Sequence, residues 1–179
     1  VATLNAVLEV MDDRTRITFE EAPSGAGQAD TANQADTAAD LEYHYNIALE
    51  WIPEGFELDC GHFKEEGTSD YVSYVNSQNG VIDIRVTPYS TGLVSSLNTE
   101  GCVKKDVTVQ NHPAMLYITS EDMLETRYYQ YGVTNIWSQM IMYWIDQDAG
   151  VIVDISATNL TEEEMIRLAE GVHWLRAPI

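Results

Sequence analysis

The sequence has few basic residues. Lysine and arginine together number 9 against 29 aspartates and glutamates, so the 179-residue chain has a formal net charge of −20. A surface this acidic repels phosphates and anionic lipid headgroups, which argues against nucleic-acid binding and against polybasic attachment to a membrane. No apolar run approaches the roughly 18 to 20 residues that a membrane-spanning helix needs. What is present is a chain that is 45% hydrophobic, which is enough for the core of one ordinary domain.

Motifs that carry chemistry are also missing from the sequence. It has no GxSxG, no P-loop, no GxGxxG after a strand-like segment, no HExxH and no CxxC. An active site would have to be assembled from residues that are distant in sequence, such as Asp83, Asp154, Glu100 and a histidine. Carboxylates of this kind usually just form the solvated face of a folded domain. We therefore predict a protein that is not an enzyme and holds no cofactor.

The sequence predicts no metal site. The four histidines have no metal-ligand partner at helical or hairpin spacing, and we interpret His112 as a turn residue and His173 as a helix-surface residue. The acidic segment 146–150 begins like a calcium loop, but Val151 and Ala157 stand where an EF-hand needs Gly and Glu. A hairpin turn is the better interpretation. Asn159-Leu160-Thr161 is formally an N-glycosylation sequon, but we interpret Thr161 as the N-cap of a helix.

The two cysteines, Cys60 and Cys102, leave two alternatives open. A disulfide would close a loop of about 43 residues and contribute roughly 4 kcal/mol in the chain-entropy model. The other alternative is a pair of reduced, half-buried thiols on strands. The spacing of the cysteines does not decide between them.

The chain divides into three parts. Residues 1–21 are predicted to form a short helix, with an apolar stripe at Leu4, Val7, Leu8 and Met11, and then a strand. Residues 22–40 contain no Val, Ile, Leu, Met or aromatic residue and repeat a hexapeptide, so we expect a flexible linker or exposed loop. Residues 41–179 form the main domain.

The main domain has an α+β pattern. Strand-like segments at 43–51, 57–64, 71–75, 81–87, 102–109, 114–120, 135–145 and 151–157 predict a curved antiparallel sheet built as a meander of hairpins. Asn79-Gly80 predicts a tight hairpin turn. The segment 135–145 is apolar on both faces, so we expect it to be covered on both sides. Thr161 to Glu164 is a capping box that starts a C-terminal helix, which we expect to pack on one face of the sheet.

An aromatic cluster is the feature with the most functional potential. It comprises Tyr128, Tyr129, Tyr131, Trp137 and Tyr143. Aromatic faces on a sheet stack on sugars or accept the apolar anchor of a partner. The alternative, which we favour, is that these side chains fill the core and pair across strands.

The order of several short motifs resembles one family. The motifs are Ile-Pro-Glu-Gly-Phe at 52–56, the Asn79-Gly80 hairpin, Asn-Thr-Glu-Gly at 98–101, Trp-Ile-Asp at 144–146, and Leu-Thr-Glu-Glu-Glu at 160–164. This order is similar to the bacterial domain-of-unknown-function family 4367 over residues 43–174. The resemblance implies an extracytoplasmic domain, carried behind one transmembrane helix in Gram-positive bacteria, and some members look like anti-sigma regulators. No catalytic or ligand residues are established for the family, so none is transferred.

Together these features predict a non-enzymatic, extracytoplasmic, membrane-anchored domain that senses or binds an envelope ligand or protein. The chain starts at Val1 without an initiator Met or a leader, so we expect a truncated or processed protein whose anchor has been removed. The alternative is a carbohydrate- or cell-wall-binding module that uses an aromatic face of the sheet.

Overall fold

The computed structural model describes residues 4–10, 14–21, 43–64, 70–88 and 94–178. Most of these residues lie in antiparallel strands, and two short α-helices accompany them, which confirms the predicted α+β class. The strands are β1 (Leu4–Val10), β2 (Arg14–Glu21), β3 (Tyr43–Leu49), β4 (Phe56–Lys64), β5 (Asp70–Asn76), β6 (Val81–Pro88), β7 (Val94–Asn98), β8 (Cys102–Val109), β9 (His112–Thr119), β10 (Gln139–Asp146), β11 (Val151–Thr158) and β12 (Val172–Pro178). The helices are α1 (Glu121–Arg127), the 3₁₀ turn η2 (Tyr129–Tyr131) and α2 (Glu162–Glu170).

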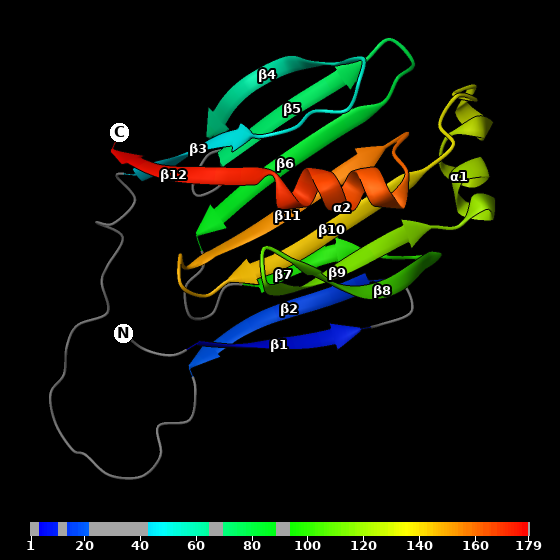
Figure 1. Ribbon diagram of the computed structural model, residues 1–179. Coiled ribbons are helices and arrows are strands. Elements are labelled where there is room, and N and C mark those ends of the chain that lie inside the picture. The colour runs from blue at the N-terminus through cyan, green and yellow to red at the C-terminus, as the bar shows by residue number, and fades with distance from the viewer. Residues whose placement is uncertain (1–3, 11–13, 22–42, 65–69, 89–93, 179) are drawn as a thin grey trace, which may run out of the picture.

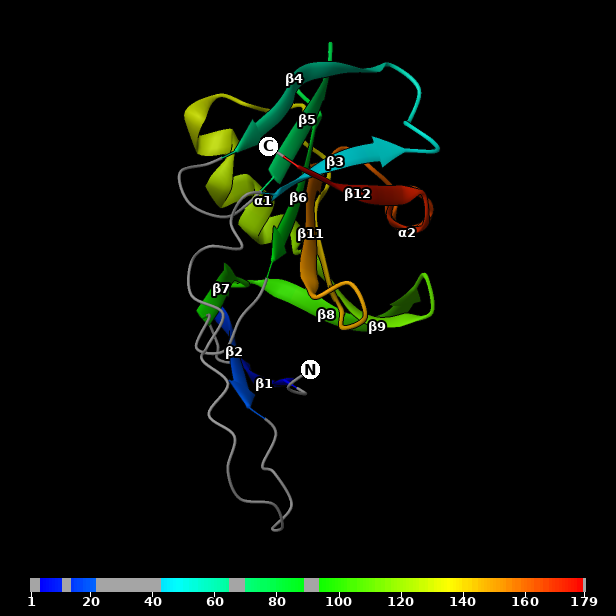
Figure 2. The same ribbon diagram turned by 90° about the vertical axis from the view of Figure 1, so that its left-hand side faces the viewer.

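The central element is a seven-stranded antiparallel sheet with the order β4-β5-β6-β11-β10-β9-β8. A two-stranded sheet of β12 and β3 and a three-stranded sheet of β1, β2 and β7 accompany it. Helix α2 and strand β12 lie across one face of the large sheet (Figure 1). Figure 2 shows that α1 lies on the opposite side of the sheet from α2.

The main core lies between the large sheet and the layer formed by α2, β3 and β12. Alternate residues of β6 point into it, and Ile82, Ile84 and Val86 are fully buried. Met165 and Leu168 of α2 belong to the same buried cluster. The period-2 pattern of the strands and the 3.6-residue period of the helix therefore bring their apolar faces together.

Strand β10 is buried on both faces, as the apolar run predicted. Met142 and Trp144 belong to the core under α2, whereas Tyr143 packs with Ile17 and Phe19 of β2 on the other face. The predicted strand is too long, however, because residues 135–138 lie outside β10.

The predicted N-terminal helix is wrong, because Leu4–Val10 is strand β1 and pairs with β2 in antiparallel register. The sequence alternates apolar residues here at 4, 6, 8 and 10, so it fits a strand as well as a helix. A helix of seven residues is marginal without a surface to pack on, whereas a hairpin satisfies its backbone groups across the two strands. Strand β2 also pairs with β7, so the described part of residues 1–21 joins the rest of the protein. Residues 22–40 lie outside the described residues, and the three-part division of the chain stays a prediction.

The C-terminal helix is shorter than predicted. It ends at Glu170 with Gly171 as its C-cap, and Val172–Pro178 continues as β12, which pairs with β3. The side chain of Gln110 donates to the carbonyl oxygens of Ala169 at 3.1 Å and of Val172 at 2.6 Å, which satisfies acceptors where the helix ends. His173 is consequently a strand residue and not a helix-surface residue, and its Nε2 lies 2.9 Å from Oε1 of Glu50.

Two turns differ from their predicted form. The β5–β6 connection spans four residues rather than the two of a tight turn, and Oδ1 of Asn76 accepts the N–H groups of Gln78 and Gly80 inside it. The β8–β9 connection is the tighter one, with Gln110 and Asn111 both at positive φ. His112 is therefore the first residue of β9 and not a turn residue.

The structure excludes a disulfide between the two cysteines. Cys60 lies on β4 and Cys102 on β8, the two opposite edge strands of the seven-stranded sheet. Six strand spacings of about 4.8 Å separate these edges, whereas disulfide-bonded Cα atoms lie within about 7 Å. Cys102 is a free, half-buried thiol.

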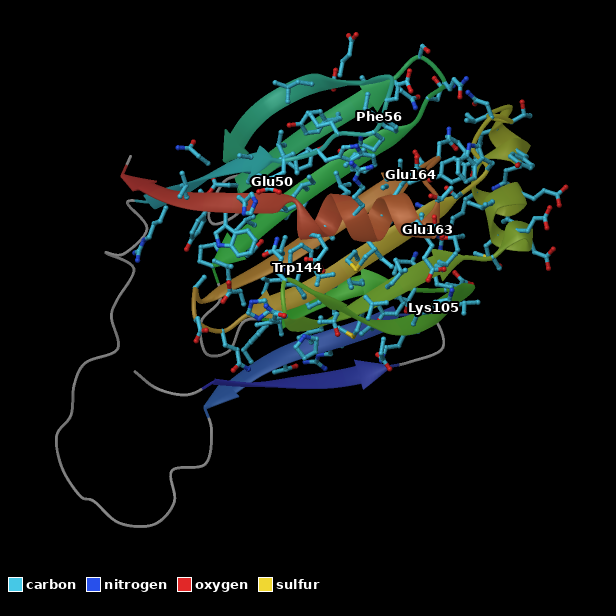
Figure 3. The ribbon with its side chains drawn as sticks, viewed as in Figure 1. Glu50, Phe56, Lys105, Trp144, Glu163 and Glu164 are labelled. Carbon is cyan, nitrogen blue, oxygen red and sulfur yellow. The ribbon has the colours of Figure 1, made fainter. Side chains whose placement is uncertain are left out.

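The predicted capping box at the start of α2 is present. Thr161 Oγ1 accepts the N–H of Glu164 at 3.2 Å, and a carboxylate oxygen of Glu164 accepts the N–H of Thr161 at 2.8 Å. Figure 3 shows Glu163 and Glu164 in the first turn, above the strand that carries Lys105. Lys105 bonds the carboxylate of Glu162 and so ties this end of the helix to β8.

We expect Thr161→Ala to lower the free energy of unfolding by about 1 kcal/mol, because it removes the acceptor for an otherwise unpaired helix N–H. Urea unfolding followed by circular dichroism measures this loss. Thr161→Ser keeps the hydroxyl and is the matched control, which we expect to retain most of the stability. Equal losses in the two variants would contradict the role assigned to the hydroxyl.

Candidate functional site

A cavity of about 460 Å³ lies on the α1 side of the large sheet. Its walls come from β6, β11 and the start of β10, and from the segment between α1 and β10 that lies against them. The lining residues are Asn79, Val81, Asp83, Tyr128, Val133, Ile136, Gln139, Ser156, Ala157 and Thr158. The cavity therefore combines an apolar floor with several groups that form hydrogen bonds.

Strand register places the polar groups of the sheet wall side by side. Asp83 of β6 lies directly opposite Ser156 of β11. On the other side of β6, Asp83 lies opposite Ser73 of β5. The hydroxyls of Tyr71 and Ser73 both donate to Oδ1 of Asp83, at 2.6 Å and 2.7 Å. These two charge-assisted hydrogen bonds fix the orientation of the carboxylate.

Gln139 connects the sheet wall to α1. Its Oε1 accepts from Nη1 of Arg127 at 3.0 Å and from Oγ1 of Thr119 at 3.2 Å. Nη2 of Arg127 also donates to the carbonyl oxygen of Glu100 at 3.0 Å. Two donors thus engage the amide oxygen of Gln139 and fix the orientation of its side chain.

Asn159 holds the segment that carries Ile136 and Trp137. Its Oδ1 accepts the N–H of Trp137 at 2.9 Å, and its Nδ2 donates to the carbonyl oxygens of Asn135 at 3.0 Å and of Gln78 at 3.3 Å. Asn159 is buried and adopts φ = 61°, a left-handed conformation that asparagine tolerates better than most residues. In the folded chain the side chain of Asn159 is buried and hydrogen-bonded, so it does not present an accessible amide for a glycan.

The five residues of the predicted aromatic cluster lie in different environments. Tyr128 lines the cavity, and Tyr129 belongs to the same segment, where its hydroxyl donates to the carbonyl oxygen of Ile136 at 3.0 Å. Tyr131 and Trp137 are exposed, by 76% and 54%. Tyr143 is only 1% exposed, and its side chain packs against β2 on one face of the large sheet. Four of the five aromatic residues thus belong to the segment over the cavity, and the fifth belongs to the core.

Burial changes the pKa of two tyrosines of the aromatic cluster, Tyr128 and Tyr143. Burial raises the pKa of Tyr128, and the charge of Arg127 opposes this effect. Burial, and after it the nearby Asp154 carboxylate, raises the pKa of Tyr143 further. Both phenols therefore stay neutral at physiological pH, and the Tyr128 hydroxyl is a neutral hydrogen-bonding group in the cavity wall.

The residues that could form an enzyme site are only partly brought together. Asp83 and Asp154 share one face of the sheet, but Asp154 lies opposite Arg85 in the strand register. Glu100 is an exposed turn residue outside the cavity lining. His112 lies 3.8 Å from Asp146 and His173 contacts Glu50, and neither lines the cavity. The side chains of His44 and His62 lie outside the described residues. Within the part of the chain that is described, no three His, Cys, Asp or Glu residues are grouped as metal ligands.

A second cavity, of about 410 Å³, lies at the β10–β11 turn. His112, Pro113, Gln147 and Asp148 are among its lining residues. Asp146 Oδ1 accepts the N–H of Ala149 at 2.8 Å, as expected of a hairpin turn rather than a calcium loop. This cavity has no counterpart of the oriented Asp83 carboxylate, so the cavity beside α1 is the stronger candidate.

Sequence reasoning missed Ser156, Gln139 and Asn159 as site residues. Asp83 and Ser156 alternate with buried residues on their strands, which showed only that they face away from the core. Their adjacency depends on the pairing of β6 with β11 across a sequence separation of about 70 residues, which no local pattern reveals.

The comparisons with known proteins identify a family for most of the chain. The family described as "Domain of unknown function (DUF4367)" matches residues 46–172. No curated protein and no solved structure matches the chain. The family match confirms the resemblance carried by the motifs between residues 52 and 164. It includes all residues that line the cavity and leaves β1 and β2 outside. Among the described residues, no helix has the length and hydropathy of a membrane span.

Proposed function

Because the chain belongs to the domain-of-unknown-function family DUF4367, we propose that it is a non-enzymatic extracytoplasmic domain of a membrane-anchored protein. It senses or binds a ligand or protein of the cell envelope, in a regulatory role of the anti-sigma type. The observation that carries the proposal is the cavity between the sheet and the segment 128–138. The acidic surface and the lack of catalytic motifs in the sequence support it.

The construction of the cavity suits ligand binding. Small-molecule sites are concave and largely apolar, and a few fixed polar groups orient the ligand. Here Asp83 is oriented by two hydroxyls and Gln139 by two donors, and Asn159 holds the covering segment in place. A preorganised site loses less conformational entropy on binding.

Protease treatment of intact cells tests the proposed location. We expect a protease added outside to remove an epitope placed in this domain while a cytosolic marker stays intact. The reason is that an extracytoplasmic domain is accessible without lysis. Cleavage only after the cells are lysed would contradict the proposal.

A wall-binding module is the alternative function. Trp137 and Tyr131 are large, exposed aromatic residues, and both belong to the segment that covers the cavity. Exposed aromatic rings with one polar edge are suited to stacking on sugar rings. This observation favours a carbohydrate of the cell wall as the ligand.

We expect Trp137→Ala to weaken retention of the domain on purified peptidoglycan by roughly 5- to 30-fold, because an aromatic contact of this kind contributes about 1–2 kcal/mol. A sedimentation assay with insoluble peptidoglycan measures the retained fraction. Leu175→Ala is the control, because Leu175 is an exposed apolar side chain on β12, away from the cavity lining. Absence of retention of the unmodified domain would end the wall-binding alternative.

A further inference from the structure

We propose that the ligand of the cavity beside α1 carries a protonated primary amine on a short aliphatic chain, and that this amine pairs with the carboxylate of Asp83. The proposal rests on the function proposed above, in which this cavity is the ligand site. It goes further in naming the chemical class of the group that the cavity binds.

The hydrogen bonds of Asp83 leave one carboxylate oxygen for a ligand. Tyr71 and Ser73 donate to the same atom, Oδ1. An ionised carboxylate accepts on both oxygens, so Oδ2 keeps its full accepting capacity. Ser73 is buried and lies on the adjacent strand, so Oδ1 is held from the β5 side of the carboxylate. An amine in the cavity would therefore meet an acceptor whose position is already fixed.

The charge of the surroundings favours a cation. Asp83 is the one acidic residue among the described residues that line the cavity, and none of these is Lys, Arg or His. Arg127 is held by Gln139 and by the carbonyl oxygen of Glu100, and Arg85 lies opposite Asp154 in the strand register. A chain with a net charge of −20 also attracts cations and repels anions at long range.

The apolar part of the cavity fits a short carbon chain. Val81, Val133 and Ile136 contribute aliphatic surface, and Tyr128 contributes an aromatic ring. Ser156 and Gln139 add neutral polar groups at the sheet wall. An aliphatic amine buries its methylene groups against the first set and places its ammonium group at Asp83.

Titration of the ¹⁵N-labelled full chain with two probes of equal length tests the proposal. The probes are 1,5-diaminopentane and 1,5-pentanediol, and the readout is the amide shifts of residues 79–83, 128–139 and 156–158. We expect saturable binding of the diamine. The diol should bind with an affinity at least about tenfold lower, because it lacks the charge. Asp83→Asn should weaken diamine binding by about tenfold, whereas Asp148→Asn, which removes an exposed carboxylate elsewhere, should change it by less than about twofold.

Three outcomes would overturn the proposal. Equal weakening by Asp83→Asn and Asp148→Asn would show that the diamine binds the acidic surface at large. Equal binding of the diol and the diamine would show that the site takes a neutral ligand, and the proposed binding function would stand. Absence of saturable shifts at these residues would exclude an amine ligand, and protease treatment of intact cells would still test the proposed function separately. If Asp83→Asn does not fold, the comparison of the two probes on the unmodified chain still decides.

Discussion

Trp144→Ala is expected to lower the free energy of unfolding by about 3–5 kcal/mol, because it leaves a large cavity in a packed core. Trp144 is 1% exposed and lies on the face of the sheet that α2 and β12 cover (Figure 3). Its ring packs against Trp174 with the ring centroids 6.4 Å apart. The indole N–H has no hydrogen-bond partner among the described residues, so the loss comes from packing alone.

Urea unfolding followed by circular dichroism measures this effect, and Trp137→Ala is its matched control. The control removes the same side chain from an exposed position, where we expect a loss below about 1 kcal/mol. If Trp144→Ala does not fold, Trp144→Phe should fold with a smaller loss, because it leaves a smaller cavity. Similar losses for Trp144→Ala and Trp137→Ala would contradict the position of β10 in the core.

Asn159→Ala is expected to lower the free energy of unfolding by about 2–5 kcal/mol. The substitution leaves the partly buried N–H of Trp137 and two carbonyl oxygens without their partner, which costs about 1–3 kcal/mol. It also places alanine at φ = 61°, which costs a further 1–2 kcal/mol or so. Urea unfolding measures the total. Broadening or shifts of the amide signals of residues 133–138 would report the loosened segment.

Asn159→Gly separates the two contributions. Glycine adopts the left-handed conformation without strain, so this variant loses only the side-chain hydrogen bonds. We expect it to be more stable than Asn159→Ala by about 1 kcal/mol and still clearly less stable than the unmodified chain. Full stability of Asn159→Gly would show that the amide does not hold the segment.

The elements that sequence patterns predicted well are those whose signal is local and unambiguous. The capping box at Thr161 and the alternation of Ile82, Ile84 and Val86 needed no information from distant residues. The apolar stripe from Leu4 to Met11 was ambiguous, because its residues fit two periods at once, and pairing with β2 decided in favour of a strand. The helix prediction past Gly171 failed for a similar reason, because β3 offers backbone partners to Val172 and Trp174.

The candidate site was the least predictable part. Treating residues 135–145 as one strand placed Trp137 and Tyr143 on the same face. In the structure Asn159 binds the N–H of Trp137, the strand begins only at Gln139, and the two aromatic side chains end in different environments. The alternation of β6 predicted that Asp83 is on the solvent-facing side of its strand. Its hydrogen-bond donors Tyr71 and Ser73 and its cross-strand neighbour Ser156 depend on the strand register.

The most direct test of the account is to locate the binding site of soluble cell-envelope fragments by amide shift mapping on the full chain. The account predicts saturable shifts at residues 79–83, 128–139 and 156–158, which surround the cavity beside α1. Saturable shifts confined to other surfaces, such as β12 or the β1–β2 hairpin, would contradict the assignment of this cavity as the ligand site.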